Sequence, residues 1–335
     1  QELDCYGSGW MSSQDHAEDL RSYRQSALAG GGMKRLESIR NSGRRTARER
    51  IRALLDEDSF HEIDSFVSHR STDDNLHLLN HLGDGVVTGH GTIDGRRVYC
   101  FAQDFSVHGG SMGEMHAQKI SKLVEMAERV RVPIICIWDG GGQRAQDGVT
   151  ALAGTGVLLD RLVQCSGRIP MISLVLGPVV GVSALSASLS DFTILGREHG
   201  QLFMSSPLET PELLSGDVDS SGLGGADLHS SRSGIACLVA EDEDDAISSA
   251  QEGQDDPFND PEDNDAGRAE FLEPDKDQTT AEDTGDLSEA HIDIPLSDDD
   301  DIEPILESKD TDQQETLEGE VNDVPDPPIE RASFI

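Results

Sequence analysis

Apolar residues between positions 25 and 55 recur at helical spacing among many arginines, and this pattern predicts amphipathic helices on either side of Gly43. Further along the chain, Asp94-Gly95 separates two strand-like runs as a hairpin turn does. The second of these runs, at 97–105, alternates as a strand does. For the arginines, two interpretations stay open: a solvated basic face, or contact with a ligand phosphate or a neighbouring subunit.

After a Gly109-Gly110 break, short apolar strands alternate with helices. The expected elements are a helix with Ile120, Leu123, Val124, Ala127 and Val130 on one face, a strand at 133–138, a helix at about 148–165, a strand at 171–176, a helix at about 181–189 and a strand at 191–195. Glycine-rich breaks follow two of the strands, at 139–142 and at Gly177-Pro178. Stacked ββα or βαβ units explain this order, so we predict an α/β fold.

Composition separates the end of the chain from the rest. Residues 251–335 hold 30 Asp and Glu against 4 Lys and Arg, and so carry a charge of −26 out of the formal −39. They also contain 8 of the 13 prolines and show no hydrophobic period. Such a segment cannot bury enough apolar surface to offset its ordering entropy. We therefore expect a flexible N-terminal arm at 1–24, a folded domain at 25–250 and a disordered acidic tail at 251–335.

Net charge and the positions of the cysteines limit which binding partners and which cellular compartment we expect. A strongly acidic chain is repelled by nucleic-acid phosphates and anionic membranes, so we expect neither as a partner. The five cysteines form no C-x-x-C pair, which disfavours disulfide frameworks and structural zinc. Three of them, Cys100, Cys136 and Cys165, lie in apolar runs typical of buried thiols. No run reaches membrane-spanning length, so we expect a cytoplasmic protein, or a mitochondrial matrix protein if a transit peptide has been removed.

A series of short phrases in a fixed order carries a family resemblance. The phrases are Ala29-Gly30-Gly31-Gly32, T-A-R-E-R-I at 46–51, G-D-G-V-V-T-G at 83–89, A-Q-D-F at 102–105, Gly109-Gly110-Ser111, Gly113-Glu114, His116-Ala117, the run 139–148, Gly177-Pro178, L-G-G-A at 223–226, His229, and Ser233-Gly234. Together they resemble the N-terminal half of the β subunit of propionyl-CoA carboxylase and related biotin-dependent acyl-CoA carboxylases.

The resemblance implies a fold and a chemistry. The fold is crotonase-like, a spiral of ββα units whose glycine loops direct backbone amides at a thioester carbonyl. Removal of an α-proton from an acyl-CoA produces an enolate, and preorganised N–H groups stabilise the charge that develops on its oxygen. The family resemblance implies that the biotin ureido nitrogen acts as the base and that carboxybiotin, carried by a partner protein, donates the carboxyl group. No metal is expected in this chain.

The resemblance also implies the site residues. The expected backbone oxyanion donors are Gly142, Gln143, Gly181 and Val182. The expected substrate-binding residues are Gly109, Gly110, Ser111, Gly141, Arg144, Gly177 and Pro178. Two residues depart from the family pattern. Gln143 stands where a small residue is usual, which leaves its amide intact, whereas Val182 replaces a glycine, and a β-branched side chain resists special backbone angles and crowds the loop. The alternative is that both loops are ordinary strand-to-helix turns.

Three functions are open at this point. The first is a carboxyltransferase component that works with a biotin carboxylase and biotin carrier and with a second carboxyltransferase half or as a homo-oligomer, since family chains are about twice as long. The second is a non-catalytic truncated relative that scaffolds or regulates carboxylase subunits. The third is a biotin-independent crotonase-like thioester enzyme. His116 and His229 are expected to be structural, because the implied mechanism requires no histidine.

Overall fold

The computed structural model describes residues 13–71, 81–206 and 220–253. The chain divides into two units, residues 1–267 and 268–335, and all described residues lie in the first. The helices are α1 (Ser13–Ala29), α2 (Met33–Asn41), α3 (Ala47–Leu54), α4 (Glu114–Val130), α5 (Val149–Cys165), α6 (Val182–Ser188), α7 (Ser220–Gly224), α8 (Ala226–Leu228) and α9 (Glu243–Gly253). The strands are β1 (His61–Ile63), β2 (Val86–Ile93), β3 (Arg96–Gln103), β4 (Ile134–Gly140), β5 (Met171–Val180), β6 (Phe192–Gly196), β7 (Gln201–Phe203) and β8 (Leu238–Ala240).

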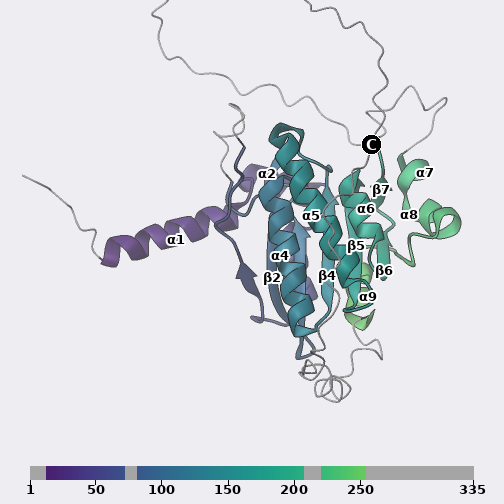
Figure 1. The fold of residues 1–335 in the computed structure, drawn as a ribbon, viewed down its shortest axis with the longest axis horizontal. Coiled ribbons are helices and arrows are strands. Elements are labelled where there is room, and N and C mark those ends of the chain that lie inside the picture. Colours follow the sequence, from purple (N-terminus) through teal and green to yellow (C-terminus); the bar gives the residue numbers. More distant parts are fainter. Residues whose placement is uncertain (1–12, 72–80, 207–219, 254–335) are drawn as a thin grey trace, which may run out of the picture. The chain divides into compact units, whose positions relative to one another are not determined.

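One mixed sheet organises these elements, in the order β1-β2-β3-β4-β5-β6-β8 (Figure 1). The first three strands are antiparallel, and β3 to β8 along this path are parallel. The short strand β7 pairs in parallel with the far end of β5, where Val179 faces Leu202. The predicted α/β class is confirmed. Parallel strands place their carboxyl ends at one edge of the sheet, so the segments after β4 and β5 lie next to each other.

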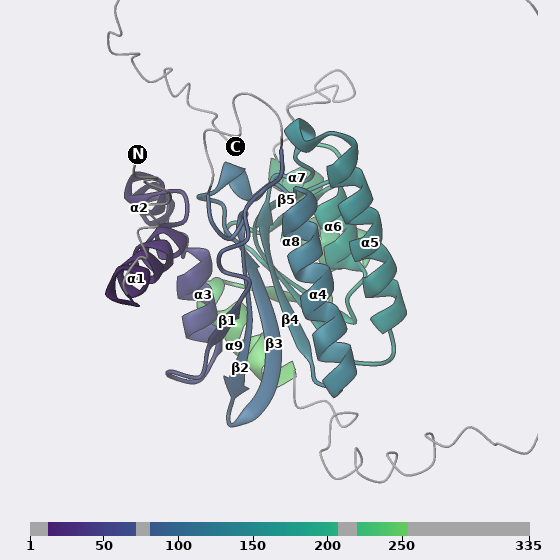
Figure 2. The same cartoon turned by 60° about the vertical axis from the view of Figure 1, so that its left-hand side comes forward.

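Helices cover both faces of the sheet, with α4 and α5 on one face and α3 and α9 on the other (Figure 2). Successive side chains on a strand point to opposite faces, which explains why the apolar strands run without polar interruption. On β4, Cys136 and Trp138 pack under α4 and α5, whereas Ile135 and Ile137 pack toward α3 and α9. Alternation along the strand thus divides the apolar side chains of β4 between the two cores.

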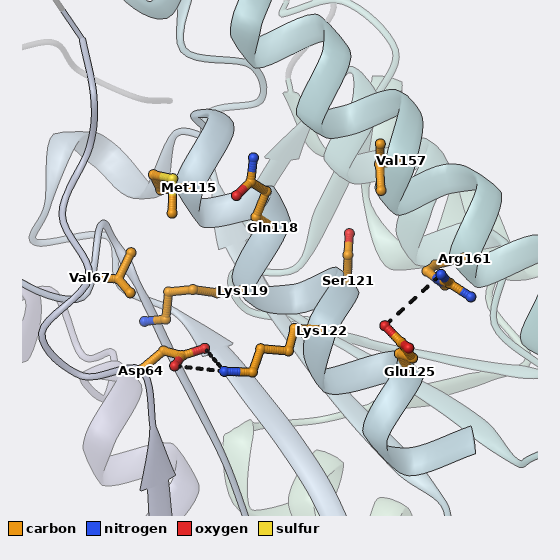
Figure 3. Close-up of a pocket in the computed structure, with 10 residues that line it drawn as sticks. All are labelled: Asp64, Val67, Met115, Gln118, Lys119, Ser121, Lys122, Glu125, Val157 and Arg161. Atoms are coloured by element: carbon orange, nitrogen blue, oxygen red, sulfur yellow. Dashed lines mark hydrogen bonds and ion pairs between the residues drawn. The ribbon is translucent and has the colours of Figure 1, made fainter. Parts of the chain in front are cut away.

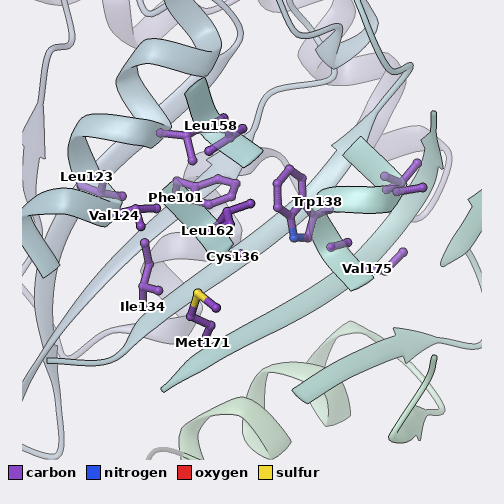
Figure 4. Close-up of a cluster of buried hydrophobic side chains, with 14 of the residues drawn as sticks. Phe101, Leu123, Val124, Ile134, Cys136, Trp138, Leu158, Leu162, Met171 and Val175 are labelled. Carbon is purple, nitrogen blue, oxygen red and sulfur yellow. The ribbon is translucent and has the colours of Figure 1, made fainter. Parts of the chain in front are cut away.

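The core under α4 and α5 contains an aromatic pair from β3 and β4 (Figure 4). Phe101 and Trp138 meet edge to face with ring centroids 4.9 Å apart. The indole Nε1 of Trp138 donates to Ser173 Oγ at 2.8 Å, so the only polar atom of this side chain is satisfied. Cys100, Cys136 and Cys165 are buried free thiols, as expected from their apolar runs. Burial raises the pKa of Cys165 to about 11.

Several predicted elements are confirmed and two differ. The hairpin at Asp94-Gly95 joins β2 to β3, and both residues have positive φ, as a type I′ turn requires. By contrast, β5 continues through Gly177-Pro178 to Val180, because β7 supplies a new neighbour there. Helix α1 begins at Ser13, inside the stretch expected to form a loose arm. The expected acidic tail lies outside the described residues beyond Gly253, where α9 ends.

The expected solvated basic face is wrong for α3. Its Thr46 N-cap forms a capping box with Glu49, and Arg50 is 1% exposed. Arg48 forms a bidentate ion pair with Glu62, with both N–O distances 2.8 Å. These arginines hold elements of this chain together.

Among the described residues, no helix is long and apolar enough to cross a membrane.

Candidate active site

Three glycine segments meet where β4 and β5 end. The turn Gly109-Gly110 packs so tightly against the end of β4 that a side chain on Gly110 would overlap the Asp139 carbonyl. Gly141 N donates to Gly109 O at 3.0 Å. A Cβ on Gly142 would lie 2.8 Å from Val180 O, which ties this loop to the end of β5. The structure therefore brings together the segments that the sequence analysis selected.

Glycine is required at two of these positions by the backbone angles. Gly142 has a φ of 84°. Gly181, the N-cap of α6, has a φ of 60° and a ψ of −124°, a combination essentially restricted to glycine. Val182 is the first residue of α6 and is not among the residues with positive φ, and its side chain packs against the core under α4 and α5. The expected conflict between a β-branched side chain and a special backbone conformation at Val182 is therefore wrong.

The amide of Gln143 lies on a backbone that hydrogen bonds hold on both sides. Its neighbours are fixed: Met112 N donates to Gly142 O at 2.7 Å, and Arg144 N donates to Met112 O at 2.9 Å. The Gln143 side chain turns toward α5, where Nε2 lies 3.3 Å from Thr155 Oγ1. In the described part of the chain, neither Gly142 nor Gln143 has an acceptor for its amide. A free amide on a fixed backbone is the geometry of a preorganised donor.

One of the two amides expected as donors in the second loop is already engaged. Gly181 N donates to Phe203 O at 2.7 Å, so Gly181 is already engaged and is corrected from donor to positioning residue. The first intrahelical hydrogen bond of α6 runs from Leu185 N to Gly181 O at 3.0 Å. The Val182 amide precedes this bond, where helix amides lack intrahelical acceptors. Of the four amides expected as donors, only that of Gly181 has an acceptor among the described residues.

Arg144 was expected to contact substrate, but its side chain is buried and binds other residues of this chain. It is 1% exposed, and its Nη1 lies 2.6 Å from Asp84 Oδ1. Its Nη2 donates to Ser111 O at 2.8 Å, and its Nε lies 3.3 Å from Ser111 Oγ. All three guanidinium nitrogens of Arg144 thus contact other residues of this chain. Arg144 fixes the Gly109-Gly110-Ser111 segment against the Gln143 loop, and Ser111 is committed to the same contact.

A buried ionic cluster lies behind the loop that follows β4. Asp139 Oδ2 lies 2.7 Å from Arg50 Nη1, and its Oδ1 lies 3.0 Å from Arg44 Nη1. Arg50 also pairs with Glu243 of α9 at 2.6 Å. Burial alone lowers the pKa of Arg50, but the two carboxylates outweigh it and raise the pKa above its usual value. A side chain on Gly177 would overlap Asp139, so the expected substrate contact at Gly177-Pro178 is replaced by close packing at Gly177.

His116 and His229 have structural partners, as expected. His116 is fully buried, with Nδ1 2.9 Å from Asp84 O and Nε2 3.3 Å from Gln103 Nε2. Burial, Arg144 and Lys119 hold the pKa of His116 well below its usual value. His229 Nε2 lies 3.0 Å from Leu202 O. Neither ring faces the glycine loops as a free acid or base.

A groove of about 450 Å³ lies over α4, away from the glycine loops (Figure 3). It is lined by Asp64, Val67, Met115, Gln118, Lys119, Ser121, Lys122, Glu125, Val157 and Arg161. Lys119 is 3% exposed, and its Nζ donates to Gly83 O at 2.8 Å and Val86 O at 2.5 Å. Burial lowers the pKa of Lys119 to about 8. The sequence analysis did not single out this lysine, because helical spacing alone does not reveal a charged residue on a buried face.

Comparison with known proteins places this geometry in a family. A family model described as "Carboxyl transferase domain" matches residues 38–284. The chain belongs to this family. The methylmalonyl-CoA decarboxylase subunit alpha of Veillonella parvula is 44% identical over 234 residues, and the propionyl-CoA carboxylase beta chain of Roseobacter denitrificans is 42% identical over 234 residues. Each match covers 70% of this chain and 46% of the relative. This carboxyl transferase chain thus spans about half the length of these relatives.

Solved structures confirm the fold. Transcarboxylase 12S with methylmalonyl-coenzyme A and methylmalonic acid bound matches with a TM-score of 0.69 and 38% identity, over 72% of this chain and 47% of that chain. A Pseudomonas malonate decarboxylase hetero-dimer matches with a TM-score of 0.50 and 27% identity, over 62% of this chain and 85% of that chain. The predicted resemblance to the N-terminal half of a crotonase-like carboxyltransferase is therefore confirmed.

Proposed function

We propose that this chain binds an acyl-CoA and stabilises its enolate during carboxyl transfer from biotin carried on a partner protein. The observation that carries the proposal is the convergence of two fixed loops with available amides at Gln143 and Val182. Two donors aimed at one oxygen stabilise the charge of the enolate more than the neutral thioester, which is the condition for lowering a barrier.

The residues around the donors hold them in place. Arg144 and Ser111 lock the first loop, and Gly181 anchors the second through Phe203 O. Backbone amides fixed in this way need no reorganisation as charge develops. We assign proton removal to the biotin ureido group and the biotin pocket to a second carboxyl transferase half.

The partner arrangement also belongs to the proposal. A malonate decarboxylase chain covered over 85% of its length is part of a hetero-dimer. This observation favours a second half contributed by another chain, and we assign a biotin carboxylase and a biotin carrier to complete the system. We propose a cytoplasmic or mitochondrial matrix setting, and one relative, from Sus scrofa, is named as mitochondrial.

Decarboxylation is a second candidate reaction. Loss of the carboxyl group from a malonyl-type thioester produces the same enolate, so the same two donors serve it. Relatives named as decarboxylases favour it specifically. The two directions differ in substrate: the forward reaction takes a simple acyl-CoA, whereas decarboxylation takes its carboxylated form. A non-catalytic scaffolding role would require neither.

Substitution at Gln143 tests the proposal. Calorimetric titration of the full chain with propionyl-CoA is expected to show binding that survives Gln143→Ala and weakens at least tenfold with Gln143→Pro, because proline removes the amide proton. Thr155→Ala is the matched control, since it removes the side-chain partner of Gln143 and leaves the Gln143 amide unchanged. Circular dichroism checks that each variant is folded. Loss of binding in Gln143→Ala, or full retention in folded Gln143→Pro, would contradict the backbone-donor mechanism.

A further inference from the structure

Three histidines form a cluster beside the candidate active site. The ring of His108 lies 6.1 Å from that of His69 and 5.3 Å from that of His81, measured between centroids. Within the described ranges, the Nε2 atoms of all three are buried without a hydrogen-bond partner. Among the described residues, they make up half of the six side-chain atoms in this condition. Buried polar atoms are normally satisfied, so three orphans in one place call for a ligand.

The remaining contacts of the rings define what such a ligand must offer. His69 Nδ1 accepts from Ser71 N at 3.3 Å, so in the neutral ring the proton sits on Nε2, which is then a donor. His81 is hydrogen-bonded to the backbone of Gly30, a contact that favours its protonated form. A bound anion would stabilise the protonated ring of His81, and Nε2 would then be a donor as well. A ligand that accepts hydrogen bonds fits these rings.

The charges around the cluster favour a negative ligand. Burial and then Arg144, His81, His69 and Arg35 lower the pKa of His108 to about 4. Burial and Arg35 also lower the pKa of His81, against the opposing effect of Asp104. Asp104 is engaged by Ser106, whose N and Oγ both donate to its Oδ1. The surroundings therefore resist additional positive charge, which an anion would relieve.

The backbone joins the cluster to the Gly109-Gly110 turn. His108 has a φ of 50°, an unusual conformation for a residue with a side chain, and it directly precedes Gly109-Gly110. A side chain on Gly109 or Gly32 would meet no protein atom within 4 Å, so open space adjoins the cluster. Strained residues of this kind concentrate at ligand sites.

We propose that His69, His81 and His108 form a subsite for an anionic oxygen group of the acyl-CoA, either a phosphate of CoA or a carboxylate on the acyl chain. This inference rests on the proposed function and adds to it the residues that receive the charged part of the substrate. A metal ion is the competing occupant. In the part of the chain that the structure describes, no group of three His, Cys, Asp or Glu side chains is arranged to hold one.

Imidazole resonances of the full chain test the subsite directly. Addition of methylmalonyl-CoA or propionyl-CoA is expected to raise the pKa of His108 by one unit or more in ¹⁵N NMR titrations, because an anion favours the protonated ring. S-propionylpantetheine lacks the phosphates and the acyl carboxylate, and is expected to leave that pKa unchanged. Zinc ions added alone form the metal control. A His108 resonance that responds to zinc but to neither CoA ester would overturn the inference.

Calorimetry with variants separates the two anion sources. His108→Asn keeps a residue that tolerates positive φ but loses the ring, and His69→Gln removes the second donor. His90→Gln is the control, because His90 forms a ring pair with His61 on β1 and β2, outside the cluster. A loss of fivefold or more for both CoA esters assigns the phosphate, and a loss for methylmalonyl-CoA alone assigns the carboxylate. Unchanged binding of both esters in folded variants refutes only this inference, whereas unmodified protein that binds neither ester refutes the proposed function as well.

Discussion

Replacement of Arg50 by methionine isolates the ionic cluster that supports the active-site loop. The guanidinium contacts Asp139 at 2.7 Å, Glu243 at 2.6 Å and Leu176 O at 3.0 Å, and it is 1% exposed. Methionine keeps much of the volume but leaves both carboxylates without this partner. Breaking a buried pair from one side typically costs about 3–5 kcal/mol, because an uncompensated charge stays behind.

The structure places the expected loss at the lower end of that range. Asp139 keeps Arg44 at 3.0 Å, and Glu243 keeps weak contacts of 3.4 Å from Arg45 N. We therefore expect Arg50→Met to lower the free energy of unfolding by about 3 kcal/mol, or the melting temperature by roughly 6–12 °C for a domain of this size. Buried pairs are weakly screened, so the loss should persist in high salt.

Urea unfolding of Arg50→Met and Arg52→Met measures this difference. Arg52 lies on the same helix with an exposed side chain, so its replacement is expected to change stability by less than about 0.5 kcal/mol. Adding Asp139→Asn to Arg50→Met removes one stranded charge and is expected to recover part of the loss. A loss below about 1 kcal/mol for Arg50→Met would show that the cluster does not support the fold as argued.

Three further predictions follow from the packing. Gly177→Ala is expected to destabilise the chain by more than about 2 kcal/mol, because the added methyl group would overlap Asp139. Gly156→Ala, on the exposed face of α5, is the control and is expected to stabilise the chain by up to about 1 kcal/mol. Urea unfolding midpoints measure both changes. His116 stays neutral when folded but takes a proton near pH 6.5 when unfolded, so stability should fall as pH drops below 6.5, and His116→Gln should flatten that slope in unfolding curves at pH 5 to 8. Val182→Gly is expected to change the dissociation constant of propionyl-CoA by less than twofold, because Val182 already has an ordinary helical backbone. A tenfold gain in affinity, measured by calorimetry, would instead indicate that the valine side chain crowds the site.

Local sequence patterns predicted most of the helices and strands. The helix expected at about 148–165 is α5 at Val149–Cys165, and the strand expected at 191–195 is β6 at Phe192–Gly196. Four of the five apolar residues expected on one face of α4 are buried, and Val130 at its last position is 45% exposed. These elements follow from periodicity and turn glycines, which act over a few residues. The extension of β5 to Val180 could not be predicted in this way, since it depends on pairing with β7, more than twenty residues further on.

The same distinction explains the candidate site. Glycines mark the loops in the sequence, because only glycine permits the φ of 60° at Gly181. The sequence does not show which amide each loop leaves free, since that depends on distant partners: Phe203 O occupies Gly181 N, while Met112 fixes the backbone on both sides of Gln143 without using its amide. Arg144, which the resemblance implies to bind substrate, is paired with Asp84, sixty residues earlier, and local sequence does not show this contact. Val182 therefore fits a position where the family pattern has glycine, because the unusual backbone angles fall entirely on the residue before it.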